Sequence, residues 1–196
     1  MVAPYQTVWH GGIVASRRDW LDAGLEILCD LGAPGLTIDQ LTGRLGLSKG
    51  SFYHHFQGIG EFKTALLAHF EAERTTRYID LVAAEPDLPA AAKLRRTLEV
   101  ILTDGNSPDV EVAVRAWALQ DPQARAVQER VDRTRIDYVG ALCREMTGSA
   151  AESEEIARML YVVIVGSRQI VPPVDIPELR RMCELTLGLA TTGSIR

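Results

Sequence analysis

Apolar residues recur at three- and four-residue spacing along most of the chain, and no segment alternates as a half-buried strand would. The first such segment begins after Ser16, which can cap a helix, and continues to about Leu31. Its apolar stripe consists of Trp20, Leu21, Leu25 and Leu28. Later segments with this periodicity cover about residues 90–103, 109–120, 122–146, 153–170 and 177–191. The pattern predicts an all-α protein.

Residues 36–56 are predicted to form two short helices joined by a tight turn. Thr37 is a good N-cap for the first helix, and Gln40, three residues later, can complete a capping box. Gly46 can adopt the left-handed backbone conformation that ends a helix sharply, and Ser48 can then cap the second helix. Two capped helices around a glycine turn indicate a helix-turn-helix.

The second of these helices has an apolar face and a polar face. Phe52 and Phe56 are four residues apart and can point inward together. The other face carries hydrogen-bonding side chains that are long enough to reach phosphates and base edges from a helix in a major groove. These side chains belong to Lys49, Ser51, Tyr53 and His54. The pattern therefore predicts binding to double-stranded DNA.

The run from Ser48 to Phe56, with the capped helix before it and the first helix ending at Gly32, resembles the DNA-binding domain of the TetR family of bacterial transcriptional regulators. The resemblance covers about residues 14–73, and the rest of the chain resembles the family only in architecture. It implies a three-helix DNA-binding domain over residues 14–73. A helical ligand-binding and dimerisation domain is then expected over residues 74–196.

The expected DNA contacts follow from this motif and from helix N-termini, whose backbone donors and partial positive charge suit phosphate. They are Thr37, Ser48, Lys49, Gly50, Ser51, Tyr53, His54 and Lys63. The sequence departs from the family pattern at two points. Thr42 stands where a small residue, usually Ala, is common, and residues 57–61 lack the Lys that the family commonly has there. Lys63 can partly replace that phosphate contact.

The charge balance shows no bulk basic domain, because the formal net charge of the chain is −5. Within residues 14–70 acidic side chains slightly outnumber basic ones, but the basic ones lie at helix starts and around the motif. We therefore expect a modest number of phosphate contacts per monomer, and specific DNA binding that depends on two monomers acting together.

A second interpretation of the motif remains open. Helix-turn-helix geometry also occurs as ordinary core packing in proteins that never contact DNA. The alternative function is therefore an all-helical small-molecule carrier or interaction protein in which the motif is only scaffold. Specific, salt-dependent retention of the DNA upstream of the coding region would separate the two interpretations.

The segment from Gly60 to about Ala84 is predicted to be one long helix that links the two domains, ended by Pro86 and Pro89. The segment Glu85 to Leu88 is turn-like rather than a long flexible linker, and such a short, stiff junction suits a mechanical signal between domains. We expect a repressor that a small organic ligand releases from its operator, because the ligand changes the spacing of two recognition helices.

The segment 159–166 is hydrophobic on every face, which in a protein without a membrane span indicates burial on all sides. A second subunit satisfies that requirement most easily. In the resembled family the last two long helices pair with their symmetry mates, which implies a homodimer. The expected interface residues are Leu160, Val163, Ile164, Ser167, Leu179, Met182, Leu185 and Leu189. The alternative is that both helices fill the core of the monomer.

The ligand-binding candidates are large or polar residues on otherwise buried segments. They are Arg115, Trp117, Arg135, Tyr138, Tyr161 and Gln169. The alternative for Trp117 is a place in the core. The alternative for the arginines is that they are solvated or paired with acidic neighbours at helical spacing. An aromatic cluster beside an arginine suits a planar or carboxylate-bearing organic molecule.

Catalysis has little support in the sequence. The residues after Pro86 contain no histidine, and no nucleophile, metal-ligand or nucleotide-binding motif occurs, so we expect neither an enzyme nor a metal or cofactor. The three cysteines lie far apart and suggest no disulfide framework, which favours a reducing cytoplasm. No apolar run of about 20 residues and no secretory signal are present, so no membrane association is expected.

Overall fold

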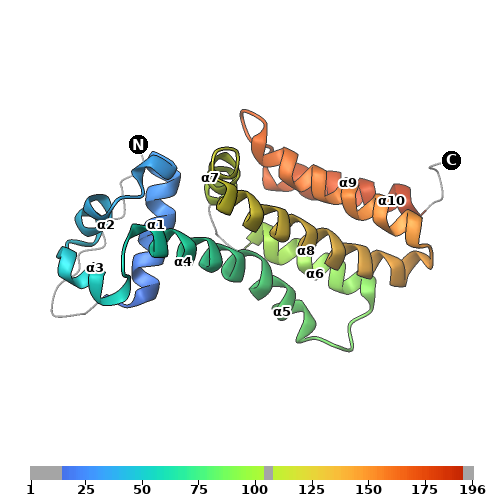
Figure 1. The fold of residues 1–196 in the computed structure, drawn as a ribbon. Helices are drawn as coiled ribbons and strands as arrows, with labels where there is room; N and C mark the ends of the chain where they lie inside the picture. The colour runs from blue at the N-terminus through green and yellow to red at the C-terminus, as the bar shows by residue number, and fades with distance from the viewer. Residues whose placement is uncertain (1–14, 104–107, 192–196) are drawn as a thin grey trace.

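The computed structural model describes residues 15–103 and 108–191, with side chains described for 15–103 and 110–188. Every described element is helical, which confirms the predicted all-α class (Figure 1). The elements are α1 (Arg17–Leu31), a 3-10 turn (Ala33–Gly35), α2 (Ile38–Leu45), α3 (Lys49–His55), α4 (Ile59–Glu71), a π turn (Ala72–Thr76), α5 (Arg77–Ala83), α6 (Ala90–Thr103), α7 (Pro108–Ala118), α8 (Pro122–Thr147), α9 (Ala150–Gln169) and α10 (Ile176–Thr191).

The first helices begin and end where the local sequence predicts. Ser16 and Asp19 form a reciprocal capping box at the start of α1. Thr37 accepts a hydrogen bond from the Gln40 N–H (3.2 Å), but the predicted box is only half formed, because the Thr37 N–H donates to the Gly35 carbonyl oxygen instead (2.8 Å). Gly46 ends α2 in the left-handed conformation, with φ of 66°.

Aromatic side chains form the centre of the first core. Trp20 meets Phe52 edge to face, with ring centroids 5.5 Å apart, and Phe56 meets Phe62 in the same way at 5.0 Å. The inward orientation of Phe52 and Phe56 is confirmed, since both are buried. The predicted inner stripe of α1 is confirmed as well, because all of its residues are buried. This core fixes α3 against α1 and α4.

The first core continues beyond the domain boundary expected at residue 73. Three α7 residues, Val110, Val114 and Trp117, join the same buried cluster, and Val127 and Val131 of α8 do so too. In Figure 1, α7 lies near α1, and the two helices are in contact. The helix-turn-helix unit is therefore packed directly on the second half of the chain and is not attached by a tether alone.

The junction between the two halves differs from the predicted single helix. The helical path is continuous from α4 to α5, but it passes through the π turn, where the Arg77 N–H donates to the Ala72 carbonyl oxygen five residues back. A π turn widens the helix and leaves carbonyl oxygens without their usual partners, and such turns are frequent at functional sites. The predicted stop before Pro86 and Pro89 is confirmed.

The second core lies among α6, α8, α9 and α10. Its buried members are Leu94, Leu98, Leu102, Leu142, Cys143, Ile156, Leu160, Leu179 and Cys183. Neither Cys143 nor Cys183 forms a disulfide, and burial raises the pKa of the Cys183 thiol to about 11. Among the described helices, none combines the length and apolar character that crossing a membrane requires.

Candidate functional site

The outward face of α3 is the first candidate site. Tyr53 is 55% exposed, and Lys49 and His54 are exposed as well. Ser48 is used as a cap, since its Oγ accepts from the Ser51 N–H at 3.3 Å. The predicted DNA contacts thus fall on the accessible surface of α2, α3 and the start of α4. Thr37, Ser48 and Gly50 are exposed, and Ser51 and Lys63 are half-buried.

Lys49 is paired in this structure. Its Nζ lies 2.6 Å from Asp39 Oδ1 on α2, and the hydrogen bond and charge of Asp39 raise the pKa of Lys49. Both side chains are exposed, so the pair is weak and screened by salt. Binding of Lys49 to a phosphate therefore requires only the exchange of an exposed carboxylate for a phosphate oxygen.

Two further side chains near α3 were not among the expected contacts. The His55 ring turns inward, with Nε2 2.9 Å from the Ala15 carbonyl oxygen, so it does not share the outward face of His54. The Arg17 guanidinium lies over the Phe56 ring, 4.9 Å from its centroid, and is half-exposed beside α3. Arg17 is a further candidate for a phosphate contact. Its place at the start of α1 was the only signal for it in the sequence.

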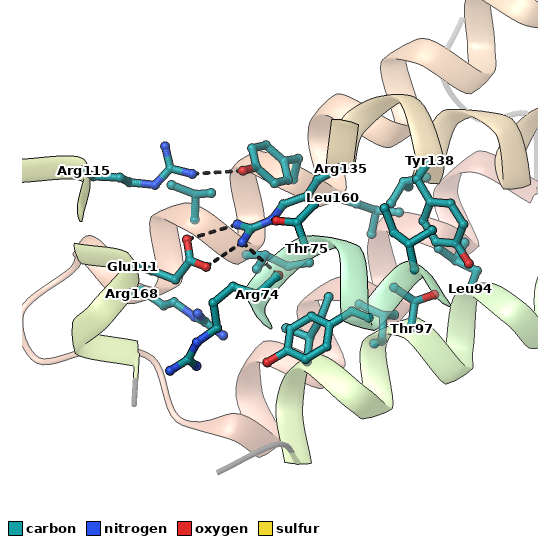
Figure 2. A pocket seen from close by; sticks show the side chains of 18 of the residues that line it. Arg74, Thr75, Leu94, Thr97, Glu111, Arg115, Arg135, Tyr138, Leu160 and Arg168 are labelled. Carbon is teal, nitrogen blue, oxygen red and sulfur yellow. Dashed lines mark hydrogen bonds and ion pairs between the residues drawn. The ribbon is translucent and has the colours of Figure 1, made fainter. Parts of the chain in front are cut away.

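A cavity of about 90 Å³ in the second half of the chain is the other candidate site (Figure 2). It is lined by the π turn and by residues of α5 to α9. Five of the six predicted ligand residues line it, namely Arg115, Arg135, Tyr138, Tyr161 and Gln169. Trp117 does not, because it lies two residues beyond Arg115 on the opposite face of α7 and is buried in the first core. The core alternative for Trp117 is therefore correct.

Arg135 of α8 is the most highly bonded side chain of the cavity. It binds both oxygens of Glu111 on α7, at 2.7 and 3.0 Å. It also donates to Thr75 Oγ1 at 2.9 Å and to the Arg74 carbonyl oxygen at 3.0 Å, both in the π turn. Burial raises the pKa of Glu111, but the charge and hydrogen bonds of Arg135 outweigh burial and hold that pKa below its ordinary value. Arg135 therefore joins α7, α8 and the π turn.

A second, partly buried network joins α7, α8 and α9. Arg115 donates to both oxygens of Asp132, at 2.8 and 3.0 Å, and to Tyr161 Oη at 2.9 Å. Tyr161 Oη in turn donates to Asp132 Oδ1 at 2.6 Å. Burial, together with this donation, raises the pKa of Tyr161 to about 12 despite the nearby arginines. Arg115 and Arg135 thus pair between helices, so the alternative of pairing at helical spacing within one helix does not hold for either.

Several lining residues were not predicted. Thr75 and Glu111 contribute to the Arg135 network, and Tyr78 and Thr97 add polar groups to the wall. Arg74 and Arg168 also line the cavity, and neither guanidinium has a hydrogen-bond or ion-pair partner among the described residues. These polar residues lie on predicted helices. The spacing of residues along the sequence does not indicate that they line the same cavity.

The exposed apolar surface of α9 and α10 is the third feature. Val162 and Leu185 are 68% and 65% exposed, and Met159 is 39% exposed. The described part of α9 is therefore not buried on all sides within one subunit. α9 and α10 pack on each other at the end of the molecule away from α3 (Figure 1).

The expected interface residues divide between this surface and the interior. Leu160, Ser167 and Leu179 are buried within the subunit, so they cannot form a contact face, because helical periodicity turns them inward. Val163 and Ile164 are partly buried against the second core. Met182 is half-buried and Leu185 is exposed. The side chain of Leu189 lies outside the described residues.

No protein-family model matches the sequence. The chain is similar to the HTH-type transcriptional regulator BetI of Cronobacter sakazakii, with 32% identity over 129 residues, 61% of each chain. It is also similar to the HTH-type regulator TtgW of Pseudomonas putida, with 38% identity over 53 residues, 27% of this chain and 40% of TtgW. The matches thus span 40 to 61% of the length of these named relatives.

Solved structures share the fold at low sequence identity. A transcriptional regulator of the TetR/AcrR family matches 89% of this chain and 97% of its own, with a TM-score of 0.75 and 20% identity. A regulator from Saccharomonospora viridis, solved in complex with choline, matches 86% of this chain and 93% of its own, with a TM-score of 0.70 and 19% identity. The fold is that of TetR-type regulators, which confirms the resemblance seen in the motif.

Proposed function

We propose that this chain of TetR-type fold is a homodimeric transcriptional regulator, acting in the cytoplasm as a repressor. In this proposal α3 binds operator DNA, and a small organic molecule in the cavity releases the operator. The arrangement of α7 is the observation that supports it best. Val114 and Trp117 of α7 pack in the core with α1, while Glu111 and Arg115 of the same helix line the cavity. One helix therefore contacts both the cavity and the core that positions α3.

The π turn provides a second connection between the two sites. It lines the cavity with Arg74 and Thr75 and continues directly into α4 of the first core. Near its start, Arg130 of α8 binds Glu71, with Nη2 2.6 Å from Oε2. A ligand that favours another position of α7 or of the π turn would therefore shift the helix-turn-helix unit relative to α8. By linkage, DNA would then weaken ligand binding by the same factor, roughly 5- to 150-fold.

The homodimer in this proposal uses the exposed apolar face of Met159, Val162 and Leu185. This face is covered by a second copy of the chain in the proposal. Operator binding requires that copy, because two half-sites about one turn of DNA apart need two recognition helices. The self-complementary contact of a two-fold dimer needs only one such face per subunit.

The assembly is tested with a substitution at an exposed position, where folding should survive. Val162→Arg should convert the dimer to a monomer in light scattering while the helical circular dichroism spectrum is retained. Leu119→Arg is the matched control, because Leu119 is 76% exposed but lies just after α7. A wild-type protein that is monomeric at micromolar concentration would contradict the dimer.

DNA binding is tested with the DNA upstream of the coding region. We expect specific retention in a gel shift that weakens steeply as salt increases, because phosphate contacts release counterions. Retention that is equal on unrelated DNA, or absent, would favour the alternative of a carrier or interaction protein. Choline, which is bound in the Saccharomonospora viridis structure, is not the ligand expected here. It is a cation, and this cavity is lined by more arginines than carboxylates.

A further inference from the structure

We propose that the cavity binds a small organic monocarboxylate, whose carboxylate is held by Arg168 and Arg74. This inference rests on the proposed function only in taking the cavity as the effector site. It adds the chemical class of the effector, which neither the fold nor the named relatives supply.

The charges that line the cavity do not balance. Four arginines line it, and Glu111 is the only carboxylate among the lining residues. Glu111 binds Arg135, and Arg115 is neutralised by Asp132 from beside the cavity. Arg74 and Arg168 remain without a hydrogen-bonded partner among the described residues. The described lining therefore carries two uncompensated positive charges.

Arg168 lies in an unfavourable environment for a cation. It is half-buried near the end of α9, and burial lowers its pKa. The charge of Glu111 opposes that effect, but the oxygens of Glu111 are already bonded to Arg135, and the charges of Arg135 and Arg74 repel Arg168. An unpaired charge away from water is costly, and a bound anion removes that cost. An arginine accepts a carboxylate with two parallel hydrogen bonds.

The opposite part of the cavity suits an apolar body. Figure 2 shows Arg74 and Arg168 at one end, and Tyr138, Thr97 and Leu94 at the other. The Tyr138 hydroxyl is buried and has no hydrogen-bond partner among the described residues. Apolar residues elsewhere in the lining include Leu98 and Ile101. The lining thus places a cationic end opposite an apolar end that has one free hydroxyl.

The size of the cavity limits the ligand. Its volume of about 90 Å³ is below the roughly 150 Å³ of an engineered cavity that admits benzene, and well below the ~300–1,000 Å³ of a drug-sized site. A short carboxylic acid fits best, and a longer or aromatic one requires some expansion. Multiply charged or large anions are not expected.

The ligand-independent test measures thermal stability of the full-length protein without additives. Arg168→Met keeps the aliphatic stem but removes the charge, and should raise Tm by about 2–4 °C because an uncompensated cation is removed. Arg133→Met is the control, since Arg133 is exposed on α8 and does not line the cavity. A fall in Tm for Arg168→Met would mean that Arg168 only stabilises the end of α9, and would overturn the proposal.

The binding test uses carboxylates from acetate to hexanoate and benzoate, the matching amides, and choline as the cation. Calorimetry on the DNA-free protein should detect carboxylates but neither amides nor choline. Arg168→Met and Arg74→Met should each weaken carboxylate binding by about 10- to 100-fold, the usual effect of losing a charged hydrogen bond, while Arg133→Met should not. Amides that bind as well as acids, or no binding by any carboxylate, would overturn the inference.

The same panel in the gel shift separates the two proposals. Release of the upstream DNA by a carboxylate supports both. Release by an amide or by choline would keep the proposed regulator and reject the carboxylate. Carboxylates that bind in calorimetry but leave DNA affinity unchanged would keep the carboxylate site and reject its role as an effector site.

Discussion

The charged side chains around α3 and those around the cavity are arranged in opposite ways. Lys49 and Asp39 form an exposed pair on the surface of the helix-turn-helix, whereas Arg135 and Glu111 are largely removed from water, with side chains 19% and 11% exposed. An exposed pair contributes little to stability and can exchange partners freely, whereas breaking a buried pair leaves an uncompensated charge. The surface can therefore exchange a carboxylate for a phosphate, while the cavity keeps its geometry.

The difference also indicates where a ligand can act. Surface pairs respond to salt and to DNA, but they carry little of the stability that positions α7. The Arg135 network joins α7, α8 and the π turn through one guanidinium, so any molecule that alters it moves all three elements together. In the proposed function, an effector in the cavity would thus act on the buried network, and DNA would act on the exposed pairs.

The largest expected effect comes from breaking the buried pair. Glu111→Gln leaves Arg135 buried without its counter-charge, and we expect a loss of about 3–5 kcal/mol in the free energy of unfolding, measured by urea denaturation. Glu154→Gln is the control, because Glu154 forms an exposed pair with Arg158 within α9 and should cost less than about 0.5 kcal/mol. Equal effects of the two substitutions would contradict the contrast between surface and cavity.

Low pH should also lower the free energy of unfolding, but by less than the Glu111→Gln substitution. The pKa values of Glu111 and Asp132 lie below their ordinary values of 4.5 and 3.8, so the unfolded chain binds their protons first. Their contribution to stability is complete above the ordinary values and is lost as the pH falls through the lower folded values. In denaturation series from pH 6 to pH 2, the Glu111→Gln variant should lose less stability than the wild type. Parallel curves for the two proteins would show that folding does not lower the pKa of Glu111.

The surface is tested by removing the two outermost side chains of α3. Tyr53→Ala and His54→Ala should each reduce operator affinity by about 1–3 kcal/mol in gel shifts, because each removes a base or phosphate contact. The free energy of unfolding should change little, since both side chains are exposed. If a folded double mutant binds the operator as well as the wild type, α3 is not the recognition helix.

The smallest expected effect is on DNA affinity, when Lys49 exchanges its partner Asp39 for a phosphate. Lys49→Ala should weaken DNA binding on all sequences alike and reduce the salt slope by about one, as expected for one phosphate contact. Asp39→Asn should strengthen DNA binding slightly, because it removes the carboxylate that competes with phosphate for Lys49. Affinity that stays the same in Asp39→Asn would mean that the pair does not compete with DNA.

Much of the helix-turn-helix could be predicted from the sequence because its determinants are local. A cap, a left-handed glycine and two aromatic residues four positions apart act within a few residues of one another, and Thr37, Gly46 and Phe52 fulfil these roles in the structure. The one local detail that differed, the half-formed capping box, arose because the Gly35 carbonyl oxygen competes for the same N–H. The DNA contacts themselves remain a prediction.

The cavity was predictable only in part, because its lining comes from six helical segments spread over residues 74–169. The sequence by itself determined that Arg115, Arg135 and Tyr161 are large polar side chains on predicted helices. Only the tertiary structure decided that they meet around one cavity, that their partners lie on other helices, and that Arg74 and Arg168 join them unpaired. Helical periodicity assigns a face to each residue, but the packing of one helix against another decides what that face meets.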